Sequence, residues 1–225
     1  FSKSYEKNMN FLKEIVLTYY SQSTSSLKFH KKQPRKMSST PDNKFNIHSY
    51  CKLNEIGRGS FGTVYRIKDK TENKIYAAKC FPVNLNQNDK ADIEITLMKD
   101  CNHATIIKFI GYSSEDFDGQ KRTTIVMDYA KNGSLRELMN KEKNGMAPHE
   151  YTNTAKQIIL AGIACGLRYL HDERHIIHRD IKPENILLDD KLRPLITDFG
   201  LSKYVDSQNS MQQSKICGTS FYMAP

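Results

Sequence analysis

The chain contains 225 residues, of which 38% are hydrophobic, 10% aromatic and 26% charged, and this composition is typical of a globular protein that can bury a core. The formal net charge of +9 is unevenly placed: residues 1–49 hold nine basic and three acidic residues, whereas residues 50–225 hold 25 and 22. The excess therefore belongs mainly to the N-terminal segment, and we expect no nucleic-acid partner for the globular part.

The cysteines and the apolar stretches restrict the compartment. Five cysteines lie far apart and form no C-x-x-C pair, which predicts reduced thiols in a reducing compartment. The apolar residues 11–20 are interrupted by Lys13 and Glu14, so this stretch is too short and too polar for a signal peptide or a membrane span. We therefore expect a cytoplasmic protein without a membrane partner, with the nucleus as an alternative location.

Residues 1–49 are expected to form a basic, largely flexible segment. Residues 11–20 are compatible with a short helix, while residues 21–44 are rich in Ser, Thr, Lys and Pro and lack apolar periodicity, as linkers do. The basic residues of this linker are Lys28, Lys31, Lys32, Arg35 and Lys36. Two interpretations stay open for them: a solvated linker, or a nuclear import signal or contact for an acidic surface.

The ordered region begins near Phe45, and its first half is rich in strands. A turn at residues 71–73 separates two of them, and a helix is predicted for residues 89–100, with Ile93, Leu97 and Met98 on one side. The five predicted strands cover residues 50–57, 63–70, 74–81, 106–112 and 123–129.

The second half is helical. From Tyr151 to His171, apolar residues recur at helical spacing over about five turns. A strand-rich half followed by a helical half is an α+β pattern, and it predicts two lobes, with the boundary near residue 130.

A glycine-rich motif follows the first strand. Residues 57–62 read Gly-Arg-Gly-Ser-Phe-Gly and continue into the strand-like Thr63-Val64-Tyr65. Dinucleotide-binding folds use the same letters, but there the glycines open a helix. A glycine hairpin between strands lets backbone N–H groups approach phosphates, although an ordinary hairpin is the alternative. The sequence has no G-x-x-x-x-G-K-[ST] motif, which excludes the P-loop class.

An unusual lysine lies in the third predicted strand. Lys79 follows Tyr76-Ala77-Ala78, and a lysine in an apolar strand either extends to solvent or meets an anion. Glu94, on the following predicted helix, is a candidate partner. A lysine held by this carboxylate and directed at the glycine loop would bind nucleotide phosphates; an edge-strand lysine in water is the alternative.

Two polar motifs between apolar runs carry the most specific signal. Residues 178–185 read His-Arg-Asp-Ile-Lys-Pro-Glu-Asn, where Asp180 can accept or orient a hydroxyl proton and Lys182 can neutralise a phosphoryl group. Asn185 can hold a metal. Asp198, in Asp-Phe-Gly after the apolar Leu195-Ile196, suits Mg²⁺, which takes oxygen ligands.

Together these linked motifs resemble the signature of the eukaryotic protein kinases, in the family's order and spacing over residues 50–225. The resemblance implies a bilobal α+β fold: an N-lobe at about 50–130 with an antiparallel five-stranded sheet and one helix, and a helical C-lobe at about 131–225. It also implies ATP and Mg²⁺ as cofactors and proteins as substrates.

The resemblance assigns roles in the nucleotide site. The glycines of residues 57–62 cover the phosphates, Glu94 holds Lys79 on the α- and β-phosphates, and Met127 is the gatekeeper before the hinge at residues 128–130. The implied ATP-binding residues are Ile56, Gly57, Arg58, Gly59, Ser60, Phe61, Gly62, Val64, Ala77, Lys79, Glu94, Met127, Asp128, Ala130 and Leu187.

The resemblance also assigns the chemical step and the hydrophobic column between the lobes. Asp180 is the catalytic base, Lys182 contacts the γ-phosphate, and Asn185 belongs to the catalytic set. Asn185 and Asp198 are the implied metal ligands. The column is formed by Met98, Phe109, His178 and Phe199.

The substrate class follows from two positions. Lys182, two residues after the catalytic aspartate, and Thr219 in Gly218-Thr219 resemble serine/threonine kinases, and phrases such as FIGYSSED and DFGLSK look most like the tyrosine-kinase-like group. Arg179 resembles arginines that wait for a phosphate on the activation segment, which would make an upstream activating kinase a partner. The serines available there are Ser207, Ser210, Ser214 and Ser220, each of which is otherwise a simple loop residue.

The chain ends at Gly218–Pro225, where the family's next residue is a glutamate, and it begins with Phe rather than Met. We therefore expect a C-terminally truncated kinase with an incomplete C-lobe, apolar helix faces without a cover, and little activity of its own. A catalytically silent module that binds nucleotide or protein partners is the alternative function. The intact Lys79, Glu94, Asp180, Asn185 and Asp198 argue against that alternative, while the missing part of the C-lobe argues for it.

Overall fold

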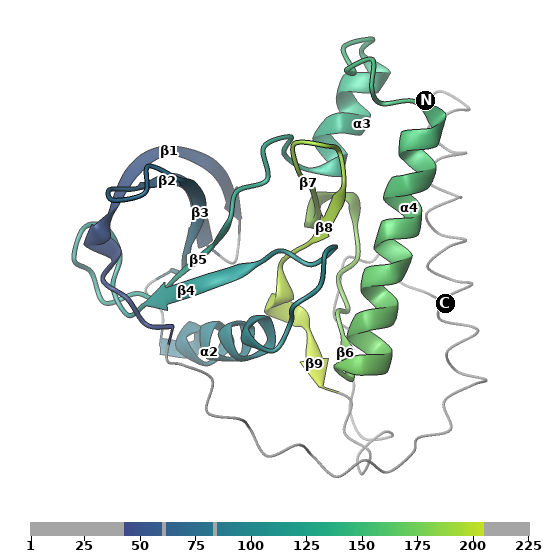
Figure 1. Ribbon diagram of the computed structural model, residues 1–225. Coiled ribbons are helices and arrows are strands. Elements are labelled where there is room, and N and C mark those ends of the chain that lie inside the picture. The colour runs from purple at the N-terminus through teal and green to yellow at the C-terminus, as the bar shows by residue number, and fades with distance from the viewer. Residues whose placement is uncertain (1–42, 60–61, 83–84, 205–225) are drawn as a thin grey trace.

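The computed structural model describes residues 43–59, 62–82 and 85–204, which form a strand-rich lobe and a helix-rich lobe (Figure 1). The two-lobed α+β prediction is confirmed. Several predicted features lie outside the described residues: the helix at 11–20, the basic cluster of the linker, Ser60 and Phe61 of the glycine motif, and the activation segment beyond residue 204, with its serines and Thr219.

The first lobe is built on an antiparallel five-stranded sheet in the order β1-β2-β3-β5-β4. The turn between β2 and β3 forms as predicted: the Asp69 carboxylate accepts hydrogen bonds from the N–H groups of Thr71 and Glu72, and Asn73 takes a positive φ of 58°. The strands are β1 (Tyr50–Gly59), β2 (Gly62–Asp69), β3 (Ile75–Cys80), β4 (Phe109–Ser113) and β5 (Thr124–Asp128), after a 3₁₀ turn η1 (Ile47–Ser49).

Helix α2 (Leu85–Lys99) packs beside this sheet, and its buried face corrects one prediction. Leu97 and Met98 are buried as expected, but Ile93 is 52% exposed. The helical period places Ala91, Glu94 and Ile95 inward with Met98, and Ile93 therefore faces away from them. The residue that takes an inward place is charged, which a search for apolar spacing alone does not find.

The second lobe carries the helices and short strand pairs. A capping box between Ser134 and Glu137 starts α3, and the Thr152 hydroxyl caps α4 by accepting from the Ala155 N–H. The predicted helix from Tyr151 to His171 forms as helix α4 followed by the short π-helix η2. The elements are α3 (Leu135–Lys143), α4 (Asn153–Arg168), η2 (Tyr169–Glu173), β6 (Ile176–Ile177), η3 (Pro183–Asn185), β7 (Ile186–Leu188), β8 (Pro194–Ile196), η4 (Phe199–Leu201) and β9 (Lys203–Tyr204).

Two glycines let α4 approach the β7–β8 hairpin closely. A Cβ built on Gly162 would lie 2.5 Å from Pro194 Cγ on β8, and one on Gly166 would lie 2.8 Å from Ile196 Cδ1 on β8 and 2.6 Å from Thr105 Oγ1. The face of α4 beside them is buried in the core, whereas Ile158 on another face is 55% exposed. Close packing of α4 on β8 fixes the hairpin that leads to Asp198 at the site.

Because of the close contact at Gly162, we predict that a substitution that normally stabilises a helix will destabilise this protein. Gly→Ala inside a helix normally stabilises by about 0.5–1 kcal/mol. Gly162→Ala should instead lower the free energy of unfolding by about 1–3 kcal/mol, because the proline ring cannot move aside without strain. Urea denaturation measures this, with Cys165→Ala on the exposed side of α4 as the near-neutral control. A stabilised Gly162→Ala variant would contradict the close packing.

Candidate active site

A buried lysine with two carboxylates lies between the lobes. Lys79 Nζ on β3 is 2.8 Å from both carboxylate oxygens of Glu94 on α2 and 2.9 Å from Oδ1 of Asp198, the residue before η4. The predicted Lys79–Glu94 pair therefore forms. Asp198, predicted as a metal ligand, joins the pair from 119 positions further along the chain.

Burial makes this group dependent on its partners. Lys79 is 7% exposed and Glu94 1% exposed. Burial acts to lower the pKa of Lys79, but the attraction of Glu94 and then of Asp198 outweighs it, so that the pKa is raised. Lys79 is thus held as a cation at neutral pH, as a phosphate-binding group must be.

The glycine motif forms a hairpin between β1 and β2, as predicted. Gly57 pairs with Val64, Arg58 with Thr63, and Gly59 with Gly62. Gly62 has a φ of 130°, and a Cβ there would clash with the Cys80 carbonyl oxygen. Gly62 is therefore required by the fold itself, because it brings β2 against β3 beside Lys79.

Side chains from three strands surround the expected adenine position. Ala77 on β3 pairs with Met127 on β5, and both are buried, while Val64 on β2 is half-buried. After the hinge, the chain is held to β7 by hydrogen bonds from the Asn132 N–H to the Leu188 carbonyl and from the Leu188 N–H to the Gly133 carbonyl. These bonds place β7 beside the chain that leaves the first lobe. The half-buried predicted contact on β7 is Leu187.

The loop before β7 brings the three predicted catalytic side chains together. Lys182 Nζ lies 2.7 Å from Asp180 Oδ2, and the Asn185 amide donates to the same oxygen at 2.9 Å. The Asn185 amide nitrogen also donates to the Asp180 carbonyl oxygen at 2.9 Å. Asp180 is buried, so these two partners fix its carboxylate in one orientation.

Two residues of the site have strained backbones. Arg179 has a φ of 64° and Asp198 a φ of 65°, a region that non-glycine residues rarely adopt. Such strain persists only where the surroundings impose it. Here the Arg179 Nε donates to the Leu201 carbonyl at 2.6 Å, and the Thr197 N–H donates to the Asn185 carbonyl at 3.0 Å.

The Thr197 hydrogen bond brings both predicted metal ligands to one place. It joins Asn185 to the residue immediately before Asp198. The Asn185 amide nitrogen is already used by Asp180, which leaves its oxygen as the atom that suits a hard cation, together with the Asp198 carboxylate. The donor set thus fits Mg²⁺. Among the described residues, no cluster of three or more His, Cys, Asp or Glu side chains could hold a metal by itself.

His178 connects the catalytic loop to the strand before Asp198. Its Nε2 bonds the Thr197 carbonyl oxygen at 2.9 Å, and its Nδ1 accepts a longer hydrogen bond from the Asp180 N–H at 3.4 Å. A carbonyl only accepts, so Nε2 carries a proton, and Nδ1 carries none because it accepts from an N–H group; the ring is therefore neutral. Its ring meets Phe199 edge to face, with centroids 5.2 Å apart. The predicted column residues Met98, Phe109, His178 and Phe199 are all buried.

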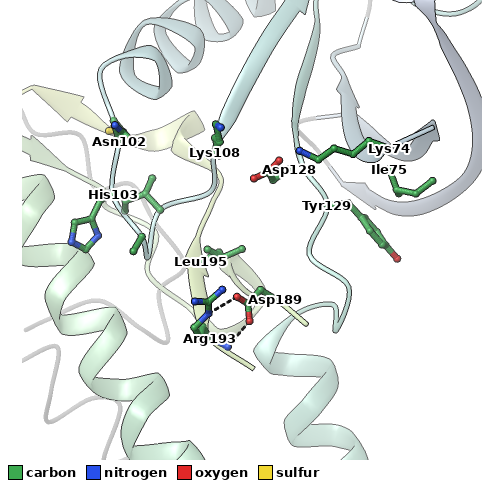
Figure 2. A pocket seen from close by; sticks show the side chains of 13 residues that line it. Lys74, Ile75, Asn102, His103, Lys108, Asp128, Tyr129, Asp189, Arg193 and Leu195 are labelled. Carbon is green, nitrogen blue, oxygen red and sulfur yellow. Dashed lines mark hydrogen bonds and ion pairs between the residues drawn. The ribbon is translucent and has the colours of Figure 1, made fainter. Parts of the chain in front are cut away.

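A cleft in the described part of the chain lies outside this group of charged residues. It encloses about 480 Å³ and is lined by the β2–β3 turn, the hinge and the β7–β8 hairpin, including Lys74, Tyr129 and Arg193 (Figure 2). Of the predicted nucleotide residues only Asp128 lines it, and Lys79, Asp180 and Asp198 do not. The candidate site is therefore identified by the convergence of charged side chains and not by this cleft.

Comparison with protein families agrees with this geometry. The model of the protein kinase domain matches residues 50–225. This chain belongs to the protein kinase family. That match covers more than half of the chain and confirms the kinase fold predicted from the motifs.

Individual relatives support the same membership. The chain is 36% identical over 178 residues to serine/threonine-protein kinase sgk-1 of Caenorhabditis elegans, 37% over 184 residues to cysteine-rich receptor-like protein kinase 29 of Arabidopsis thaliana, and 33% over 197 residues to serine/threonine-protein kinase polo of Drosophila melanogaster. These alignments cover 77%, 79% and 84% of this chain but only 36%, 26% and 32% of the relatives.

No helix in the described residues has both the length and the apolar character needed to cross a membrane.

Some contacts of this kinase site were missed by the sequence analysis. Thr197 and Leu201 hold His178 and Arg179 through backbone carbonyls, and the Ser202 hydroxyl donates to the His178 carbonyl at 3.1 Å. Backbone carbonyls leave no trace in the residue type, so nothing in the sequence marks the first two. Ser202 could have been suspected only from its place next to the Asp-Phe-Gly motif.

The buried, neutral His178 predicts a loss of stability in acid. Burial lowers its pKa below the usual value near 6.5, so the unfolded chain binds more protons below that pH than the folded chain does. Stability should therefore be full above about pH 6.5 and fall below it, by at most about 1.4 kcal/mol per pH unit from this residue. Urea unfolding at pH 7.5 and 5.5 measures the change.

The control for this prediction is His178→Gln, which removes the titration. Other groups, including His171, whose pKa is also lowered by burial, remain in both proteins. The acid-induced loss should be smaller in the variant. Equal losses in the two proteins would show that His178 does not contribute to it.

Proposed function

We propose that this chain is the nucleotide-binding part of a protein serine/threonine kinase that transfers the ATP γ-phosphate to protein hydroxyls. The observation that carries the proposal is the convergence of Lys79, Asp180, Asn185 and Asp198 from three separate segments: β3, the loop before β7 and the segment before η4. Membership of the family and the printed names of serine/threonine kinases among the relatives support it. A silent interaction module has no need for a buried lysine with two carboxylates and an oriented Asp180.

Some residues of the site would position the nucleotide for phosphoryl transfer, and others would neutralise the charge of its phosphates. The hairpin of Gly57, Gly59 and Gly62 would cover the phosphates, and Lys79 would neutralise the α- and β-phosphates while Glu94 holds it in place. Val64, Ala77 and Leu187 would sandwich the purine, and the backbone at residues 128–130 would hydrogen-bond it. Mg²⁺, held by Asn185 and Asp198, supplies neutralising charge for the phosphates when bound.

The chemical step falls to the catalytic loop. As the substrate hydroxyl oxygen bonds to the γ-phosphorus, the bond to the β–γ bridging oxygen breaks and ADP leaves. Asp180 would accept the hydroxyl proton, and Lys182 would stabilise charge on the transferring group. The hydrogen bond from Asn185 keeps the Asp180 carboxylate aimed while this happens.

Finer assignments rest on the resemblance. Lys182 and Gly218-Thr219 support serine and threonine as acceptors, and the phrases FIGYSSED and DFGLSK support the tyrosine-kinase-like group. Arg179 supports activation by an upstream kinase that phosphorylates the segment after residue 204. We place the protein in the cytoplasm, with nuclear entry through the basic cluster of residues 28–36 as the alternative.

Nucleotide binding gives the first test of the proposal. Mg-ATP should raise the melting temperature of the protein, since a ligand that binds only the folded state stabilises it. Lys79→Met should abolish or greatly reduce this rise, because the phosphates lose their cation. Differential scanning fluorimetry with and without Mg-ATP measures it, and Lys141→Met on exposed α3 is the matched control. An equal rise of the melting temperature in wild type and Lys79→Met would show that Lys79 does not bind the nucleotide phosphates.

Phosphoryl transfer gives the second test. Asp180→Asn keeps the shape of the side chain but cannot accept the proton, so the rate should fall by roughly a hundredfold or more. The measurement is transfer of labelled phosphate to a generic basic protein substrate by the full-length protein. Asp190→Asn, an exposed change nearby, should leave the rate unaltered. Phosphate on tyrosine rather than serine or threonine would contradict the proposed substrate class.

A further inference from the structure

The chain just before β1 covers an edge of the first-lobe sheet. Strand β4 is the last in the order β1-β2-β3-β5-β4, so one of its sides is a sheet edge. Along that side the Tyr112 N–H donates to the Asn43 carbonyl oxygen, and the Phe45 N–H donates to the Tyr112 carbonyl oxygen, both at 3.0 Å. Lys44 pairs with Tyr112 in a parallel bridge. We call residues 43–46 the strap, and Figure 1 shows this part of the chain passing the arrowhead of β4.

Strand β4 is shaped to receive the strap. A Cβ built on Gly111 would lie 2.4 Å from the Asn43 carbonyl oxygen and 2.6 Å from ring atoms of Phe45. Gly111 has no positive φ, so the strap depends on its small size and not on its conformational freedom. A register shift between Phe109 and Gly111 leaves Ile110 without a partner in β5, and the Asn43 amide donates to the Ile110 carbonyl oxygen at 3.4 Å.

The strap is anchored by the residues around it. Ile47, directly after the strap, is fully buried in an apolar cluster that includes Tyr76 and Ala78 of β3. The half-buried Phe45 ring packs against the same cluster, with its centroid 5.3 Å from that of Tyr50. The match to the kinase domain begins at residue 50, so family membership does not by itself account for the strap.

The strap stands at one end of a row of paired residues that contains Lys79. The row crosses every strand of the sheet and ends in the glycine motif. Its members, in order across the strands, are Lys44, Tyr112, Ile125, Lys79, Val64 and Gly57. Paired strands are joined by backbone hydrogen bonds and by contacts between side chains of the same face, so fixing one end of the row restricts its other members.

We propose that the strap is a conformational device that couples the chain before residue 43 to the phosphate-binding Lys79. The inference rests on the proposed kinase function. With the strap seated on β4, the row that holds Lys79 is stiffened, and release of the strap loosens it. By reciprocity, a nucleotide that binds Lys79 in the stiffened sheet stabilises the seated strap by the same factor.

The strap is held weakly enough to be released. Three hydrogen bonds and one half-buried ring join it to the sheet, while Ile47 keeps η1 in place behind it. A segment with few buried contacts opens locally without unfolding of the whole domain. A partner that binds the chain before residue 43 and draws the strap away would therefore lower the affinity for nucleotide.

Two substitutions release the strap from opposite sides. Phe45→Ala removes its ring, and Gly111→Ala places a methyl group where the strap lies. In the full-length protein, each should speed hydrogen exchange of the Tyr112 amide by about tenfold or more, because this amide donates to the strap. Exchange of the β3 amides should rise by about three- to tenfold, and Mg-ATP binding should weaken by a similar factor.

The controls come from the strap itself and from the double variant. Lys44→Ala changes an exposed strap side chain but keeps the backbone bonds, so it should alter none of these quantities. In the Phe45→Ala background, Gly111→Ala should weaken Mg-ATP binding less than twofold further, since the strap is already released. Phe45→Ala adds no bulk to β4, so it tests the coupling even if Gly111→Ala does not fold.

The outcomes separate this inference from the proposed function. The α4 amides of the second lobe are the internal reference, and equal acceleration there and in β3 would overturn the coupling, because the variants would then only destabilise the fold. Unchanged β3 exchange or unchanged Mg-ATP affinity in a variant with faster Tyr112 exchange would overturn it as well. Faster exchange confined to Tyr112 and the sheet, in a protein that binds no Mg-ATP, would uphold the coupling of the strap to Lys79 and refute the nucleotide site.

Discussion

The arrangement of this kinase domain depends on one buried cation. Lys79 comes from the sheet, Glu94 from α2 and Asp198 from the segment before η4. Lys79 Nζ lies 2.8 Å from a Glu94 carboxylate oxygen and 2.9 Å from an Asp198 carboxylate oxygen. Removing one partner of a buried pair typically costs about 3–5 kcal/mol, because the other charge stays buried without compensation. The elements that carry the three residues are thereby constrained to one relative placement. The same placement is the one that the proposed phosphate binding would use.

Close backbone approaches support this placement from both lobes. Gly62 brings β2 onto β3, which carries Lys79, and Gly162 brings α4 onto β8, which leads to Asp198. Two residues at the candidate site, Arg179 and Asp198, also have a positive φ. Hydrogen bonds from neighbouring segments hold these two residues in conformations that they would not adopt alone. Close packing away from the candidate site thus preserves the geometry at that site.

The sequence was most informative where residue type and spacing carry the signal. Alternation and turn residues predicted the five strands, and the asparagine with positive φ at position 73 lies in the predicted turn. Five motifs in order predicted the kinase fold, which the family match confirms. Two details of the predicted helix at residues 89–100 differ in the structure. Helix α2 starts at Leu85 rather than near residue 89, and Ile93 faces outward. Glu94 rather than Ile93 lies on the buried face of α2, because its carboxylate pairs with Lys79 there.

The sequence by itself determined which side chains are available for chemistry: Lys79, Glu94, Asp180, Asn185 and Asp198 were named from motif and order alone. Only the tertiary structure decided how they are held. Asn185 uses its amide nitrogen on Asp180, His178 is kept neutral by burial while its Nε2 bonds the Thr197 carbonyl, and Tyr204 reaches Asp100 at the end of α2. These contacts join residues far apart in the chain, often through backbone atoms that every residue possesses. Local sequence therefore cannot specify them, and they appear only when packing brings the two lobes together.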